Sequence, residues 1–158
     1  MSHYRCRFQR AYEHQVKGEL DEAVELYKKS IATLPTAEAH TFLGWTYSHM
    51  GDHERAIAEA KKAIPLDPDF GNPYNDIGVY LIELGREDEA IPYLRQAMRA
   101  KRYCCHQFPH FNLGRIYLKK KMYEQAREEF ERALRIDPEY APALKGLELL
   151  RELRDRQI

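Results

Sequence analysis

Apolar residues recur along this chain at the three- and four-residue spacing of amphipathic helices rather than at the alternating spacing of strands. Two such series follow each other between residues 42 and 64, namely Phe42, Leu43 and Tyr47, then Ala56, Ile57, Ala60 and Ile64. A polar break that contains Gly51 separates the two series. The pattern predicts two helices joined by a short turn, and similar pairs of apolar series occupy most of the chain.

Glycines repeat with a period of about 34 residues in two interleaved series. One series consists of Gly44, Gly78 and Gly114, and the other consists of Gly18, Gly51 and Gly85. The first series falls inside predicted helices, where glycine costs roughly 1 kcal/mol relative to alanine, so we expect it to let a partner helix approach closely. The second series falls between the two helices of a pair and suits the left-handed turn that ends a helix. The chain is therefore predicted to consist of repeated helix-turn-helix units.

The repeated residues resemble those of the tetratricopeptide repeat family, in which a large residue, Leu-Gly, Tyr, Ala, an aromatic residue and Pro recur in every unit. The fourth unit has His110, Leu113, Gly114, Tyr117, Ala126, Phe130 and Pro138 at those places. The second unit has His40, Leu43, Gly44, Tyr47, Ala56 and Pro68 there. The resemblance implies an all-α fold, a right-handed α-superhelix of about four units in a single domain over residues 1–158. The predicted units are 4–36, 37–70, 71–106 and 107–140.

The tail after the fourth unit, residues 141–158, has the pattern of one further helix. Leu144, Leu147 and Leu150 form an apolar stripe, and the opposite face is expected to be polar. Repeat arrays need such a helix to cover the apolar side of their last unit. The tail is therefore predicted to be a capping helix.

The stretch "KRYCCHQFPHFNLG", Lys101 to Gly114, places two cysteines and two histidines close together, as a metal site would. Pro109 is expected to keep Phe108 out of a helix, which separates His106 from His110, and adjacent cysteines do not have the usual spacing of zinc ligands. We interpret the stretch as a longer loop between units. A metal or reactive-thiol role for Cys104 and Cys105 is the less favoured alternative.

Composition narrows the possible classes of protein. The 25 basic and 25 acidic residues cancel, so no net charge draws the whole molecule to nucleic acid or to a membrane surface. The apolar runs are far shorter than the ~20 residues that span a bilayer, so no membrane-spanning segment is expected. An odd number of cysteines and an N-terminus without the pattern of a signal peptide favour a cytoplasmic location.

The sequence contains few features that would indicate an enzyme. Because the repeat accounts for six of the eight glycines, no glycine-rich phosphate loop remains. His14, His49 and His53 lack a nearby serine or cysteine in a strained turn of the kind that nucleophilic catalysis uses. We expect neither an enzyme nor a bound cofactor or metal.

The resemblance implies that the first helix of each unit lines a concave groove, the usual ligand site of the family. Trp45 falls on this groove, and the repeat's own packing positions are already filled, so the core does not require its size. Large aromatic side chains of this kind are favoured anchors for a partner, although packing against Val79 is an equally supported role. The Lys and Asn clamp with which some members hold a chaperone's C-terminus is absent. The predicted groove residues are Tyr12, Trp45, His49, Asn75, Val79, Phe111, Arg115 and Lys119.

Residues 95–121 include eight basic and no acidic residues. Their spread over several faces favours a solvated surface, and a local positive field for an acidic peptide is the functional alternative. We therefore predict a scaffold that binds a peptide or helical segment of another protein. Self-association through the groove or a terminal helix is the main alternative, and RNA binding through residues 95–121 is the less favoured one.

Overall fold

A computed structural model describes the backbone of residues 3–157 and the side chains of residues 10–157. Within residues 3–157 the chain forms nine helices and no strand, with one isolated bridge between Phe70 and Arg102. Ile158, the last residue of the predicted cap, lies outside the described part. The helices are α1 (His3–Val16), α2 (Leu20–Thr33), α3 (Ala37–His49), α4 (His53–Leu66), α5 (Asn72–Glu83), α6 (Glu87–Arg99), α7 (Gln107–Lys119), α8 (Tyr123–Ile136) and α9 (Ala141–Arg156).

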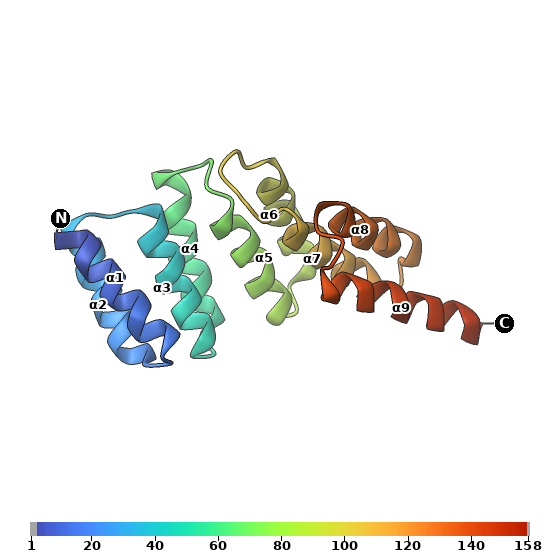
Figure 1. Cartoon of the computed structure of the whole chain (residues 1–158), viewed down its shortest axis with the longest axis horizontal. Helices are drawn as coiled ribbons and strands as arrows, with labels where there is room; N and C mark the ends of the chain where they lie inside the picture. The colour runs from blue at the N-terminus through green and yellow to red at the C-terminus, as the bar shows by residue number, and fades with distance from the viewer. Residues whose placement is uncertain (1–2, 158) are drawn as a thin grey trace.

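The helices stack in consecutive pairs along the longest axis of the molecule, and the two ends of the chain lie at opposite ends of the stack (Figure 1). Neighbouring odd-numbered helices contact each other from α1 to α9, and each also packs on the even-numbered helix before it. Within the described residues the backbones of the even-numbered helices do not approach one another, and side chains such as Lys61 of α4 over the ring of Tyr93 of α6 make the contacts between them. The odd-numbered helices therefore form the tighter inner layer of a right-handed α-superhelix, as the sequence predicted.

Both glycine series have the structural roles that their spacing predicted. A Cβ on Gly114 would lie 2.4 Å from a ring carbon of Phe130, so only glycine lets α8 pack this closely on α7. Gly51 joins α3 to α4 with a φ of 84°, in the left-handed region. Lys121 occupies the corresponding turn of the fourth unit with a φ of 60°, which costs a non-glycine residue roughly 1 kcal/mol.

The core consists of one long apolar cluster, a second cluster at its C-terminal end and a small third one of Ala37, Ala63 and Phe70. The first extends from Ala11 to Ile116, and the second surrounds Phe130. Helix α9 covers the second cluster with Ala143, Leu147 and Leu150. Leu144 does not belong to this buried stripe, because it is 48% exposed.

The loop between α6 and α7 differs in one respect from its prediction. Phe108 lies inside α7, although Pro109 follows it. Pro109 is the third residue of the helix, and backbone N–H groups in the first turn have no acceptor within the helix. The lack of an N–H in proline therefore costs the helix no hydrogen bond. The predicted boundaries between units lie in the connections before α3, α5, α7 and α9, and the division into units stays a prediction.

Candidate partner-binding groove

A row of side chains occupies the same place on each odd-numbered helix of the inner layer. Tyr12, Trp45, Val79 and Arg115 belong to this row, as predicted from the repeat. Leu149 on α9 continues it, since it follows Arg115 by the 34 residues that separate Trp45 from Val79. Tyr12 is 42% exposed, Trp45 38% and Leu149 42%, whereas Val79 and Arg115 are half-buried. Sequence reasoning ended the row one helix early because it treated residues 141–158 only as a cap.

The N-terminal half of the row is aromatic. The rings of Tyr12 and Phe42 meet edge to face with centroids 5.8 Å apart, and Trp45 lies against His49 with ring centroids 3.7 Å apart. His49 Nδ1 lies 2.9 Å from the backbone oxygen of Trp45. Because a carbonyl oxygen only accepts, Nδ1 carries the proton and donates. The ring of His49 is thereby fixed beside the indole. We call Tyr12, Trp45 and His49 the aromatic half.

The C-terminal half of the row is occupied by ion pairs. Arg115 lies 3.5 Å from a carboxylate oxygen of Glu83, and Lys119 pairs with Glu87. The bond from Lys119 holds the pKa of Glu87 below its ordinary value. These side chains surround a hollow of about 410 Å³ between α5 and α7. We call Glu83, Glu87, Arg115 and Lys119 the ion-paired half.

Two predicted groove residues face the protein rather than solvent. Asn75 is 6% exposed, because its Oδ1 accepts a hydrogen bond of 3.1 Å from Nδ2 of Asn112 on the next inner helix. Phe111 is half-buried, with its ring centroid 5.8 Å from Phe130 and 5.4 Å from Tyr140. The expectation that Asn75 is an exposed contact residue is therefore wrong, and Phe111 presents only part of its surface.

Half of the basic residues of 95–121 are paired with carboxylates of neighbouring units. Lys120 pairs with Asp88, and Arg102 lies within 2.6 Å of Asp67 and 2.9 Å of Glu38. Together with Arg115 and Lys119, four of the eight basic residues of 95–121 have carboxylate partners. Arg95 and Arg99 instead line an outer hollow of about 480 Å³ that also contains Glu128 and Glu129. The stretch presents a much weaker positive field than its sequence suggests.

His40 and His110 occupy the same place in two units, and each holds a pair of helices together. His40 Nδ1 lies 2.8 Å from Glu59, and His110 Nδ1 lies 2.7 Å from Glu129, each pair joining the two helices of one unit. Burial alone would raise the pKa of Glu129, but its hydrogen bond to His110 and the nearby Arg132 hold that pKa below its ordinary value. The large residue at this place in the repeat therefore packs between the two helices of its unit.

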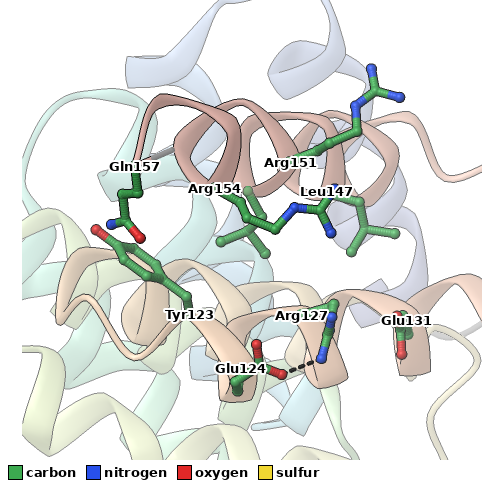
Figure 2. A pocket seen from close by; sticks show the side chains of 9 residues that line it. Tyr123, Glu124, Arg127, Glu131, Leu147, Arg151, Arg154 and Gln157 are labelled. Carbon is green, nitrogen blue, oxygen red and sulfur yellow. Dashed lines mark hydrogen bonds and ion pairs between the residues drawn. The ribbon is translucent and has the colours of Figure 1, made fainter.

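A further hollow of about 370 Å³ lies between α8 and α9 (Figure 2). Figure 2 shows side chains of both signs around it, with Arg127 and Glu124 paired on α8 and Arg151 and Arg154 on α9. Among residues 10–157, no group of three or more cysteine, histidine, aspartate or glutamate side chains could hold a metal ion. Within the same part of the chain, no helix is both long and apolar enough to cross a membrane.

Comparison with known proteins agrees with the stacked helix pairs. Models of the tetratricopeptide repeat match residues 37–70, 72–104 and 108–140. The chain is 30% identical over 129 residues to the type IV pilus assembly protein PilF of Pseudomonas aeruginosa, an alignment that covers 82% of this chain and 49% of PilF. It is 36% identical over 70 residues to the small glutamine-rich tetratricopeptide repeat-containing protein 2 of Mycosarcoma maydis, covering 44% of this chain and 20% of that protein.

The chain spans half or less of the length of these two relatives. Among solved structures, PilW, a type IV pilus biogenesis factor, superposes with a TM-score of 0.87 at 21% identity, covering 95% of this chain and 69% of PilW. That likeness concerns the fold alone. The repeated residues, the stacked helix pairs and the matching repeat models together show that this chain belongs to the tetratricopeptide repeat family.

Proposed function

We propose that this protein is a non-enzymatic scaffold whose concave face binds an extended or helical segment of another protein. The carrying observation is the row of side chains on the inner helices, above all Trp45, which is 38% exposed. An indole that the core does not need, fixed beside an ordered histidine ring, is suited to anchor an apolar side chain of a partner.

The charges of the groove favour a partner that binds through an apolar side chain over a partner that binds through a carboxylate. A partner carboxylate at Arg115 or Lys119 must displace Glu83 or Glu87, and exchanging one surface ion pair for another yields little free energy. The aromatic half requires no such exchange. We therefore expect the partner segment to carry an aromatic or large aliphatic side chain that sits on Trp45, and the acidic-peptide alternative is less well supported.

The test uses the single tryptophan as its own reporter. Peptides selected from a random display library on the purified protein should share an aromatic or large aliphatic residue and should change the fluorescence of Trp45 on titration. Tyr12→Ala should weaken binding at least about tenfold, because it removes a neighbouring part of the anchor site. Leu66→Ala is the matched control, since Leu66 is similarly exposed at the end of an outer helix.

Selected peptides that bind the Tyr12→Ala variant as tightly as wild type, with no change in Trp45 fluorescence, would place recognition on another face. The outer hollow beside Arg95 and Arg99 is then the next surface to test.

Self-association is the second candidate, and it is favoured by exposed leucines on α9. Leu144 and Leu149 are both more than 40% exposed. Sedimentation across a dilution series, with Leu144→Glu as the variant, separates a concentration-dependent dimer from a monomeric scaffold. RNA binding is less well supported, because half of the basic stretch is already paired and only a steep loss of affinity with salt would support it. A cytoplasmic location stays a prediction.

A further inference from the structure

Cys104 and Cys105 lie side by side in the loop between α6 and α7. Their Sγ atoms are 2.6 Å apart, Cys104 is exposed and Cys105 is partly exposed. Both are free thiols. A ligand in solution therefore reaches two sulfur atoms that are already close together.

The loop holds the two thiols between fixed points. On one side, the backbone N–H of Arg102 donates to Asp69, and the backbone N–H of Gly71 donates to Arg102. The Arg102 side chain adds an ion pair to Asp67, and its guanidinium lies 4.1 Å from the centre of the Phe70 ring. On the other side, the backbone oxygen of Cys105 accepts from Phe108 N–H in the first turn of α7. The thiol pair is thus preorganised rather than carried on a freely moving segment.

The chemistry of the pair favours a ligand that takes both sulfurs. Burial and the hydrogen bond with Cys104 raise the pKa of Cys105 to about 11, so this thiol is protonated near neutral pH and is a poor nucleophile on its own. Among the described residues no third cysteine, histidine or carboxylate completes a metal site, so a tetrahedral zinc centre does not fit. A soft centre with two exchangeable positions does fit, because the first sulfur bond brings the second thiol to a high effective concentration.

We propose that Cys104 and Cys105 form a vicinal dithiol site for trivalent organoarsenicals and similar soft electrophiles that accept two thiols. The proposal is independent of the function proposed for the concave groove. With phenylarsine oxide, the arsenic–oxygen double bond is replaced by two arsenic–sulfur bonds. The two thiol protons leave with the oxygen as one molecule of water. Arsenic stays trivalent, so the step needs neither an oxidant nor a reductant.

Phenylarsine oxide is the probe for this site. One equivalent should add to each reduced chain by intact mass, and two of the three thiols should then fail to react with a thiol-titrating reagent. A small dithiol should remove the arsenical, whereas the same concentration of a monothiol should not. Cys104→Ser and Cys105→Ser should each weaken binding at least about 100-fold, because only one sulfur bond remains. Cys6→Ser should bind like wild type.

Three outcomes would overturn the site. They are equal binding by wild type and the two single variants, loss of binding in Cys6→Ser, and a bound species whose size corresponds to two chains joined through arsenic. A thermal melt of each variant accompanies the measurement. Because the thiols lie in a surface loop, we expect the serine variants to melt within about 2 °C of wild type, which keeps a loss of binding distinct from a loss of fold.

Discussion

The two halves of the inner row differ in how they satisfy their side chains. In the aromatic half, Trp45 and His49 pack on each other and leave apolar surface facing solvent. In the ion-paired half, Arg115 and Lys119 reach back to carboxylates of the preceding unit. A ligand gains from covering the first surface, whereas it competes with existing partners at the second. The same repeat position can therefore supply an anchor in one unit and a link between units in another.

The largest contrast in stability is expected between a buried and an exposed side chain of the inner helices. Leu113 is 2% exposed between α7 and its partner helix, so Leu113→Ala should lower the free energy of unfolding by about 2–5 kcal/mol. Trp45→Ala should lower it by less than Leu113→Ala does, because 38% of Trp45 is already exposed to water. Chemical denaturation of both variants measures the difference. A Trp45 variant as unstable as the Leu113 variant would mean that the aromatic half is core.

The hydrogen bond between α5 and α7, the inner helices of the ion-paired half, comes next in size. Asn75→Ala leaves Nδ2 of Asn112 buried without its partner, so the free energy of unfolding should fall by about 1–3 kcal/mol. Peptide affinity at Trp45 should stay within about twofold, since the bond positions α5 against α7 and does not face the groove. Replacing both asparagines with alanine should recover part of the loss. A large loss of affinity without a loss of stability would restore Asn75 as a contact residue.

The pH dependence of the free energy of unfolding tests the burial of Asp76 on α5. Burial raises the pKa of the Asp76 carboxyl on α5 from 3.8 to about 7. The folded chain therefore binds this proton more tightly than the unfolded chain, and the corresponding stability is lost as pH rises from about 4 to about 7. Asp76→Asn should remove this slope and stabilise the protein by about 1 kcal/mol or more at pH 8. Equal slopes in wild type and variant between pH 4 and 7 would contradict the assignment.

The smallest effect is expected in the ion-paired half. Lys119→Glu places a second negative charge beside Glu87, but the side chain of residue 119 is exposed and can turn away into solvent, so the melting temperature should fall by only about 1–2 °C. The decrease should shrink in high salt, because exposed charges are screened. A decrease as large as that of Leu113→Ala would show that these pairs hold the units together.

The sequence predicted the helices and turns well because their signals are local. Gly51 is required by its own positive φ, and Gly114 is required by the single helix that packs on it. Both requirements recur in every unit, so the period of the glycines reveals them. The charge pattern was harder to interpret. Arg115 and Lys119 follow Glu83 and Glu87 by 32 residues, a spacing that is invisible within residues 95–121 alone.

Burial of polar groups was the least predictable feature. The side chain of Asn75 can face either the groove or Asn112, and the rotation of α7 against α5 decides between them. No single repeat position fixes that rotation. The fold could thus be predicted from periodicity, whereas the candidate site required the relative placement of neighbouring units.

The outer layer is only loosely joined, and we expect this to make the protein elastic along its length. Because only side-chain contacts such as that of Lys61 with Tyr93 join the outer helices among the described residues, we expect the superhelix to tighten or open without separating a packed outer interface. Small rotations at each junction between units then add along the chain. We therefore expect a long ligand to change the curvature of the groove at every unit that it contacts. Pulling the two ends apart should uncoil the molecule gradually before any helix unfolds.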